Sequence, residues 1–573
     1  MTAVDLPSLF RRAVPDSPLY RDRLSRELAL IERFGFAESF AQIREILDLA
    51  AGFRHITRGS AGCSLVAYLM GIHNMDPVER GFVLSRFMHE ARPDLPDIDV
   101  DFGHNDRDEV LRRVMARYGN RVARISNHVR HREGSAIRQA LREAGFRGFL
   151  PRGFRLEDVA GDRSEEILHR SRALLGSLKN YSLHCGGIVI FPGAVPDELK
   201  IAESQISLNK DEVEERGLFK IDLLCNRGIS QLDELSSRPL EDYPENDEAT
   251  ARLFRTGDTW GVTFAESPAQ RKLHREISPT SRADVAFSLA LIRPFPSADG
   301  RKLEAIADFH ARRDGSLVYD DDAILMIQRA VGCSESEAEV FRKAFAKQDA
   351  EKMGAFSRML GRHPQRDAIM RQLGYLKLYS FCRAHATSYG NLVWALAYEK
   401  VRQPHRFWAA ALNHAQTMYK PWVHHQQAKA AGLKFAAFGR GPWHLEGVHL
   451  VPSRREHGED GWSQYARRGY WISDRFMPGM YAKYRDSRCG FRGLIAAGRH
   501  HVAGGREITF VTLGVETGRF LDIVIDGVHD FESSEILEGE GLESGRVIIC
   551  HRFSFHSVAR PQKSLFDSQG FRK

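Results

Sequence analysis

The first hydrophobic pattern along the chain has the period of an amphipathic helix. Leu24, Leu28 and Ile31 share one helical face, and the pattern returns over 43–47 after a break at Gly35. Further helices are predicted over 65–70 and 108–114, and the stretch 131–138 is predicted to enter another helix. These patterns predict an N-terminal part in which helices alternate with short strands.

One short segment, 96–102, alternates carboxylates with apolar residues. As a β-strand it places Asp97, Asp99 and Asp101 on one face and its apolar side chains on the other. Three like charges on one face repel each other, and they are expected where a hard divalent cation such as Mg²⁺ binds them. A solvated edge strand is the alternative interpretation of the same residues.

Asp222 is a further acidic candidate, because it lies inside the otherwise apolar segment 217–224. Burying an isolated carboxylate is very costly, so an aspartate in such a strand must be paired, protonated or bound to a metal. We therefore expect Asp222 to be the partner of the acidic strand. The apolar segment 188–191 predicts another buried strand.

Small residues precede the helix predicted over 65–70. In this segment Arg58, Gly59 and Ser60 could meet an anion, because backbone N–H groups at the start of a helix face outward and Arg58 adds positive charge. The alternative is ordinary capping by Ser60 or Ser64. The spacing fits neither a Walker loop nor the GxGxxG motif.

From about residue 505 the hydrophobic period changes to two. Alternation over 508–512, 520–525 and 546–553 predicts strands, with Gly518 and Gly527 between them. Several aromatic and basic residues precede these strands, over 431–490. They are compatible either with a grip on a DNA backbone or with a small core.

Composition adds limits on partners and compartment. A net charge of +7 and a pI near 9.0 are compatible with a polyanionic partner. The seven cysteines form no CxxC pair, which favours reduced thiols over a disulfide framework or a zinc site. The sequence shows neither a signal peptide nor an apolar run that could span a bilayer, so we expect a cytoplasmic protein without a membrane partner.

Taken in order, the motifs resemble those of C-family bacterial DNA polymerases, the DnaE-type alpha subunit of DNA polymerase III. Residues 58–60, the acidic strand and the Phe-Lys-Ile-Asp run at 219–222 come first. Segment 261–267 reads Gly-Val-Thr-Phe-Ala-Glu-Ser and resembles the family's Gly-Ile-Phe-Gln-Leu-Glu-Ser motif. Later matches are 291–294 with the Phe-Arg-Pro-Gly-Pro element, 341–347 with a basic helix, and 380–389 with Phe-Asn-Lys-Ser-His-Ser-Ala-Ala-Tyr.

The resemblance, which covers roughly 20–430, implies an α+β multidomain fold with a nucleotidyltransferase-type palm, a helical thumb and helical fingers. Segment 510–518 also resembles the family's OB-fold, which implies a C-terminal OB-like β-barrel that binds single-stranded template; a spacer is the alternative. The implied domains are a palm at 1–130 and 179–227, a thumb at 131–178, fingers at 228–430, a reduced DNA-binding or linker region at 431–495, the OB-like domain at 496–558, and a flexible tail at 559–573.

The resemblance also implies site residues. The family's catalytic triad falls on Asp99, Asp101 and Asp222, which are expected to bind two Mg²⁺ ions, while Asp97 matches a position that is not a main ligand. The triphosphate contacts are expected from Arg58, Gly59 and Ser60 in the palm and from Arg342, Lys343, Lys347, Arg383 and His385 in the fingers. Without the resemblance, the helix at 342 would read as a solvated face and His385 as a core histidine.

The C-terminal tail contains Gln562, Ser564, Leu565 and Phe566, which resemble the peptide that docks bacterial polymerases on the sliding clamp. A tail that folds back on the protein is the alternative.

Together these features predict a DNA-directed DNA polymerase that adds deoxynucleoside triphosphates to a primer–template DNA and binds the sliding clamp. The family's metal-binding PHP domain has no counterpart in the sequence, and no second acidic cluster resembles an exonuclease, so we expect no intrinsic proofreading. Two alternatives remain open: an error-prone lesion-bypass member of the family, and a catalytically silent scaffold that binds DNA and the clamp.

Overall fold

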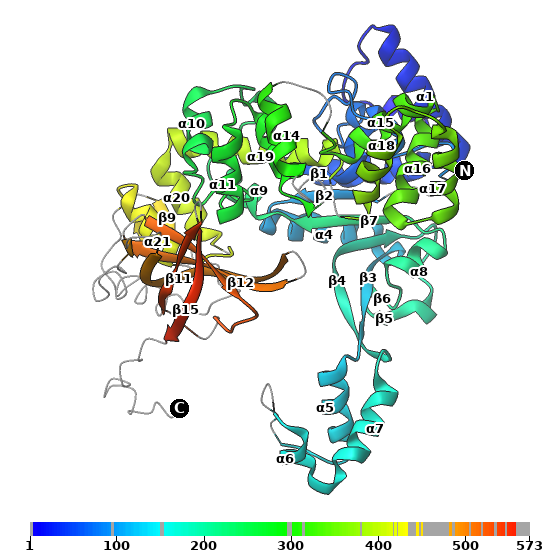
Figure 1. The fold of residues 1–573 in the computed structure, drawn as a ribbon. Helices are drawn as coiled ribbons and strands as arrows, with labels where there is room; N and C mark the ends of the chain where they lie inside the picture. Colours follow the sequence, from blue (N-terminus) through cyan, green and yellow to red (C-terminus); the bar gives the residue numbers. More distant parts are fainter. Residues whose placement is uncertain are drawn as a thin grey trace. The chain divides into compact units, whose positions relative to one another are not determined.

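The computed structural model divides the chain into two compact units (Figure 1). The first comprises Met1–Asn226 with Glu335–Glu339, and the second comprises Arg227–Ser334 with Val340–Lys573. The structure describes residues 4–92, 97–148, 150, 154–294, 301–311, 316–378, 381–415, 417–420, 422–433, 443–445, 448–450, 481–483, 488–503, 506–516, 519–531, 534, 536–544 and 547–556. Within these ranges no helix has both the length and the apolar character needed to cross a membrane.

A seven-stranded mixed sheet forms the centre of the first unit, in the order β1-β2-β7-β4-β3-β6-β5. The acidic strand β2 runs parallel to β7 and antiparallel to β1, while β4 covers the other edge of β7 in antiparallel orientation. The strands are β1 (His55–Arg58), β2 (Ile98–Phe102), β3 (Val122–Arg130), β4 (Leu178–Ile190), β5 (Lys200–Ala202), β6 (Gln205–Ile206) and β7 (Lys220–Cys225). The strand predicted within 96–102 is thus confirmed over Ile98–Phe102, and the strands predicted at 188–191 and within 217–224 are confirmed as the end of β4 and as β7.

The helices of the first unit include those predicted from periodicity. The break at Gly35 is confirmed: its backbone has a φ of 71°, a left-handed conformation that ends the first helix and is easy for glycine. The α-helices are α1 (Pro18–Phe34), α2 (Ala37–Leu49), α3 (Leu65–Leu69), α4 (His104–Tyr118), α5 (Glu133–Glu143), α6 (Leu156–Ala160), α7 (Ser164–Leu174) and α8 (Lys210–Glu215). The 3₁₀ helices are η1 (Leu6–Leu9), η2 (Gly59–Cys63), η3 (Leu84–Arg86), η4 (Gly119–Arg121), η5 (Gly161–Arg163) and η6 (Asp197–Leu199).

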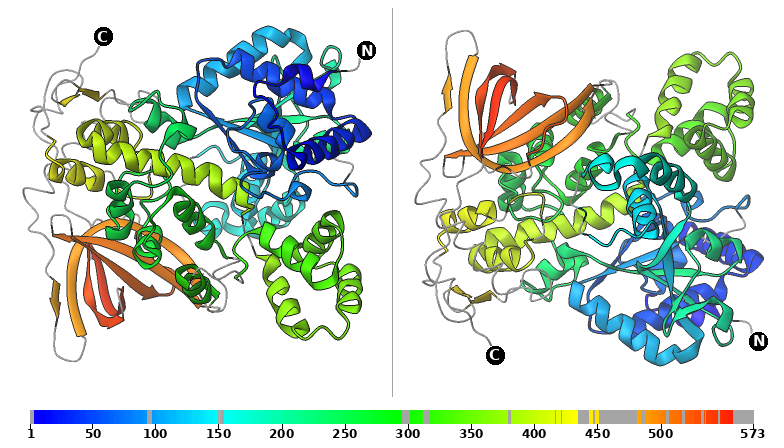
Figure 2. Two further views of the ribbon diagram at one scale, coloured as in Figure 1. Left: turned by 90° about the horizontal axis from the view of Figure 1, so that it is seen from above. Right: turned by 90° about the horizontal axis from the view of Figure 1, so that it is seen from below.

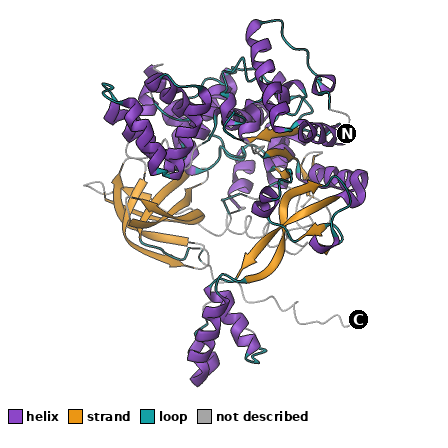
Figure 3. Cartoon of the chain, turned by 90° about the vertical axis from the view of Figure 1, so that its right-hand side faces the viewer, coloured by secondary structure: helices purple, strands orange, loops and turns teal. Residues whose placement is uncertain are grey.

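Strands β3 and β4 continue beyond the sheet as a two-stranded ribbon, and helices α5, α6 and α7 lie at its tip (Figures 1 and 3). These helices have a small core of their own, formed by Ala140, Leu141, Leu156 and Ile167. The segment predicted as the thumb, 131–178, coincides with this insertion between the two strands.

The second unit is helical up to residue 430. Its long helix α19 (Arg383–Arg402) is buried over most of its length, and Trp394 on it stacks on Phe254 of α10 at 5.8 Å between ring centroids. The other helices are α9 (Arg227–Asp233), α10 (Glu248–Thr256), α11 (Pro268–Ile277), α12 (Arg282–Leu291), α14 (Arg301–Ala311), α15 (Asp320–Val331), α16 (Glu335–Lys347), α17 (Ala350–Leu360), α18 (Arg366–Gly374), α20 (Pro404–Asn413) and α21 (Trp422–Ala430), with η7 (Leu240–Asp242) and η9 (Tyr375–Lys377).

The C-terminal strands form a six-stranded sheet in the order β10-β11-β12-β13-β15-β14, and β14 also pairs with β11. Among β11 to β15 each strand therefore pairs with two of the others, and the five curve around one apolar core that includes Ile495, Val511, Ile523 and Leu537 (Figure 2). The strands are β10 (Tyr481–Lys483), β11 (Arg488–Ala503), β12 (Arg506–Glu516), β13 (Arg519–Asp526), β14 (Ile536–Ser544) and β15 (Val547–His556). A hairpin of β8 (Trp443–Leu445) and β9 (Val448–Leu450) precedes them.

The alternation in the sequence predicted β12, β13 and β15, which are confirmed, but not β11 or β14. Strand β11 begins at Arg488, before the predicted start of this domain at 496. Most of the predicted linker region and the whole clamp-binding-like tail, 559–573, lie outside the described residues.

Glu27 organises the packing of the first unit, because its fully buried carboxylate caps the start of α3. It accepts hydrogen bonds from the backbone N–H groups of Leu65 (2.8 Å) and Val66 (3.0 Å) and from the Ser64 hydroxyl (2.8 Å). Arg23, one turn earlier on α1, neutralises it at 2.7 Å. A distant helix thus supplies the anion that the dipole of α3 favours.

We expect Glu27→Ala to destabilise the first unit by about 3 kcal/mol, because it leaves a guanidinium and two backbone N–H groups without their buried acceptor. Thermal denaturation followed by circular dichroism measures the loss. Glu32→Ala, on the exposed side of the same helix, is the control and should change stability by less than about 0.5 kcal/mol. Equal melting temperatures for the two variants would contradict this account of Glu27.

Candidate active site

The parallel pairing of β2 and β7 positions the acidic residues. Asp99 and Asp222 occupy directly paired positions in this register, and the apolar neighbours Ile98 and Val100 are buried on the opposite face of β2. On the other side of β7, Gly186 of β4 allows close approach, since a Cβ there would lie 2.4 Å from the Leu223 carbonyl oxygen. Backbone geometry therefore fixes the spacing of the two carboxylates.

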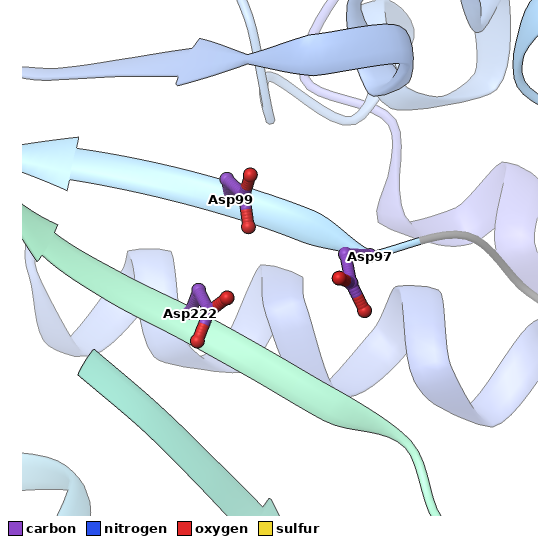
Figure 4. A group of neighbouring side chains, drawn as sticks. All are labelled: Asp97, Asp99 and Asp222. Carbon is purple, nitrogen blue, oxygen red and sulfur yellow. The ribbon is translucent and has the colours of Figure 1, made fainter. Parts of the chain in front are cut away.

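Three carboxylates converge at this point: Asp97, Asp99 and Asp222 (Figure 4). In the part of the chain that the structure describes, they are the one group of three or more potential metal-ligating side chains, and their ligand atoms lie within 4.8 Å of one another. Asp222 is buried, Asp99 is half-buried and Asp97 is exposed at the start of β2. One oxygen of Asp99 and one of Asp222 are buried and have no hydrogen-bond partner among the described residues.

Lys220 supplies positive charge inside this cluster. Its buried ammonium contacts Asp222 at 2.5 Å and Asp97 at 3.2 Å. Burial lowers the pKa of Lys220, but the two carboxylates outweigh this effect and raise it overall. Burial and the repulsion of Asp222 raise the pKa of Asp99 to about 7, although Lys220 and Arg58 oppose the shift.

Asp101 lies on the same strand but turns to different partners. Its carboxylate is paired with Arg58 at 2.9 Å and accepts a hydrogen bond from Asn226 at 2.8 Å. Asp101 is almost fully buried, so the pairing compensates a charge that water cannot reach. The three carboxylates that converge are therefore Asp97, Asp99 and Asp222, while Asp101 of the predicted triad lies on the same strand and is paired with Arg58.

His184 borders the cluster from β4. Its Nδ1 accepts a hydrogen bond from the Gly187 N–H at 2.8 Å, which assigns this nitrogen as unprotonated, and it lies 3.7 Å from Asp222. Burial lowers the pKa of His184, although Asp222 opposes the shift. A neutral imidazole is thus held beside the carboxylates.

The segment predicted to contact phosphate lies next to the same site. Arg58 is paired in register with Asp99, and Gly59 and Ser60 follow in η2, where Gly59 has a left-handed φ of 75°. The free N–H groups expected at the start of the next helix are not available to a ligand, because Glu27 accepts from two of them and the Ser64 side chain accepts from Ala67. Capping by Ser64, the alternative interpretation, is therefore correct for this helix.

The predicted finger residues lie in the second unit, where an acidic turn orders two of them. Arg342 of α16 lies 3.8 Å from Asp320, and Arg383 contacts Asp322 at 2.6 Å, both aspartates being in the first turn of α15. The backbone N–H of Arg383 donates to Asp321 at 2.8 Å. The remaining predicted residues are Lys343 and Lys347 on α16 and His385 on α19.

Sequence reasoning missed two residues that lie at this cluster, Lys220 and Asn226. Lys220 precedes Asp222 by two positions on the same strand, so alternation alone could have placed it on the same face. Asn226 just beyond β7 gives no comparable signal, because its contact with Asp101 spans 125 positions.

Comparisons with known proteins point to one family. Residues 6–150 match the model of the bacterial DNA polymerase III alpha NTPase domain, and residues 228–363 match that of the bacterial DNA polymerase III alpha subunit finger domain. The chain is 26% identical to an error-prone DNA polymerase of Symbiobacterium thermophilum over 83% of its own length and 49% of that protein. It is 28% identical to a DNA polymerase III subunit alpha of Halalkalibacterium halodurans, over 68% of the chain and 40% of the relative. The chain thus spans less than half the length of these relatives.

The site fits a divalent cation. Hard cations prefer carboxylate oxygens, and here two such oxygens are buried without a hydrogen bond while like charges repel. A cation between Asp97, Asp99 and Asp222 would remove this repulsion, whereas Lys220 offsets it only in part.

We expect Asp222→Asn to weaken Mn²⁺ binding at least about tenfold, equivalent to 1.4 kcal/mol, because it removes a buried negative charge from the cluster. Electron paramagnetic resonance of free Mn²⁺ measures the affinity. Asp197→Asn, whose parent side chain is 94% exposed in η6, is the control and should bind Mn²⁺ like the wild type. Unchanged affinity in Asp222→Asn would rule out the cluster as the cation site.

Proposed function

The chain belongs to the DnaE-type C-family of bacterial DNA polymerases, and from this we propose that it is a DNA-directed DNA polymerase that adds deoxynucleotides to a primer 3′ end. The observation that carries the proposal is the pair of aspartates on adjacent parallel strands, with a third carboxylate beside them, inside the region that matches the NTPase domain. We further propose that the enzyme acts on primer–template DNA in the cytoplasm.

We assign Asp99, Asp101 and Asp222 as the ligands of two Mg²⁺ ions, with Asp97 as an additional carboxylate at the entrance. When bound, such ions lower the pKa of the primer hydroxyl and neutralise charge on the triphosphate and the leaving pyrophosphate. The chain's own contribution is to hold the carboxylates in a fixed register and to balance their charge with Lys220.

Arg58 has two partners in this proposal. Its guanidinium neutralises Asp101, as the 2.9 Å contact indicates. When a nucleotide binds, the guanidinium of Arg58 turns to the triphosphate, because its planar fork can donate two hydrogen bonds to one phosphate group. Asp101 then needs a new counter-charge, and Asn226 keeps its carboxylate oriented during the exchange. Gly59 and Ser60 complete the contacts to the triphosphate on this side.

From the second unit we assign Arg342, Lys343, Lys347, Arg383 and His385 to nucleotide binding. The support is chemical: Arg342 and Arg383 are ordered by the aspartates of α15, so their charge is preorganised rather than disordered. A preorganised guanidinium stabilises charge that develops on transferring phosphoryl groups.

We also propose domain roles. The seven-stranded sheet is the palm, the helices α5–α7 are the thumb, and the helices over 228–430 are the fingers. The C-terminal strands form an OB-like barrel that binds single-stranded template. Two observations support this: among β11–β15 each strand pairs with two of the others, and β13 pairs with β15 in parallel. The tail is assigned to the sliding clamp.

A lesion-bypass role is the second candidate. It is favoured by the names of several relatives, which are error-prone DNA polymerases from Symbiobacterium, Alkalilimnicola and Azoarcus. DNA polymerase III alpha subunits of Halalkalibacterium and Aquifex match at similar identity, so both candidates rest on the same polymerase chemistry. A silent scaffold is disfavoured because it has no need to maintain a repulsive carboxylate cluster.

The direct test is primer extension with Mg²⁺. We expect wild-type protein to extend a primer and Asp101→Asn to be slower by a factor of about 10² or more, the scale of losing one preorganised electrostatic contact at a reacting centre. Asp197→Asn is the surface control and should extend at the wild-type rate. Equal rates for wild type and Asp101→Asn would contradict the proposed mechanism. If the wild-type protein extends no primer, the catalytically silent scaffold is the alternative that remains.

The tail generates a separate prediction. The double variant Leu565→Ala, Phe566→Ala should bind a bacterial sliding clamp at least about tenfold more weakly, because docking of such a peptide depends on apolar side chains in a groove. Surface plasmon resonance measures the affinity, and extension without clamp should stay unchanged. Ser568→Ala, in the same tail, is the control. Wild-type clamp affinity in the double variant would contradict the assignment.

A further inference from the structure

Four aromatic side chains form a continuous row of ring contacts in the second unit. Phe381, just before α19, and His385 and Tyr389 on it follow one another at intervals of four residues and are stacked, with ring centroids 4.2 Å and 4.9 Å apart. The ring of Phe264 contacts that of Tyr389 at 4.8 Å between centroids and is tilted by 56° to it. We call these four residues the aromatic stack.

The two ends of the aromatic stack differ. Phe381 is 6% exposed and lies under the guanidinium of Arg293 at 3.9 Å, so this end is closed. Phe264 at the other end is 41% exposed. At this end the row therefore presents part of a ring to solvent.

The backbone at Phe264 is held in an unfavourable conformation. Its φ of 70° is in the left-handed region, which a bulky residue avoids. Strain of this kind persists only where the surroundings impose it, and it is concentrated at functional sites. The family motif that segment 261–267 resembles has Gln at the position of Phe264, so the aromatic ring here is a feature of this chain.

The flanking residues show what imposes the conformation. The Thr263 hydroxyl donates to Gln231 at 2.8 Å, and the Thr259 hydroxyl donates to the Ala265 carbonyl at 2.7 Å. Val262 and Ala265 are fully buried. The loop is thus anchored on both sides of Phe264, and the exposed ring is presented by a rigid support.

From this geometry we infer that Phe264 and the aromatic stack behind it bind a nucleobase by stacking. Every base has a flat π-face, and an aromatic platform binds it with little dependence on sequence. His385 in the middle of the stack couples the platform to the residues assigned to the nucleotide. The inference rests on the proposed function, and the base belongs either to the template strand or to the incoming nucleotide.

The test uses 2-aminopurine, whose fluorescence is quenched when it stacks. In one arm it is the first unpaired base of the template in a primer–template; in the other it is the base of a deoxynucleoside triphosphate added to an ordinary primer–template. We expect the wild type to bind and quench in one arm, which identifies the source of the base. Phe264→Leu should lose that quenching and bind the same probe about 5- to 150-fold more weakly, equivalent to about 1–3 kcal/mol.

Three further variants make the result decisive. Phe264→Tyr keeps a ring and should restore both quenching and affinity. Phe264→Gly removes the ring while accepting the left-handed backbone without strain, so it should fold at least as stably as the wild type and still lose the base contact. Leu303→Ala removes a side chain that is 72% exposed on α14 and should behave as the wild type.

The outcomes separate the stacking from the function on which it rests. Wild-type quenching and affinity in both Phe264→Leu and Phe264→Gly, with binding intact, would overturn the stacking inference alone. A wild-type protein that binds neither probe would overturn the proposed function and the stacking together.

Discussion

The parallel register of β2 and β7 places Asp99 beside Asp222, and the rest of the first unit has to offset the repulsion between these two carboxylates. Placing two carboxylates about 4 Å apart costs about 4 kcal/mol at an effective dielectric constant of 20. The ammonium of Lys220, between Asp222 and Asp97, offsets part of this repulsion. Buried apolar residues behind β2 and a glycine where β4 approaches β7 allow the strands to pack closely in spite of the rest. The unit therefore maintains an anionic site that folding alone would disfavour.

The second unit applies the same principle with the signs reversed. Three consecutive aspartates at the start of α15 hold two arginines that come from different helices, α16 and α19. In both units a charged side chain is thus balanced by a protein partner of the opposite sign, which lowers the cost of keeping the charge away from water.

Local patterns predicted those features that local physics determines. Periodicity located α1 and α2 with the stop at Gly35, and the cost of an isolated buried carboxylate identified Asp222 as a partner for β2. The contacts of Glu27 with α3 and of Asn226 with Asp101 were not predicted, because each depends on long-range packing. Strands β11 and β14 were missed because glycines in both interrupt the alternation of apolar and polar residues. Pairing with neighbouring strands in the sheet nonetheless holds them in the extended conformation.

The ribbon formed by β3 and β4 has a mechanical consequence. Strand β4 runs without interruption from the helices at the tip to Gly187, which is paired with Asp222. A force on α5–α7 is therefore carried along a hydrogen-bonded lever to the strand that holds the buried carboxylate. The irregular pairing between Arg124 and Ser126 gives the lever a bend close to the sheet, so that a displacement of the tip reaches Asp222 through this bend.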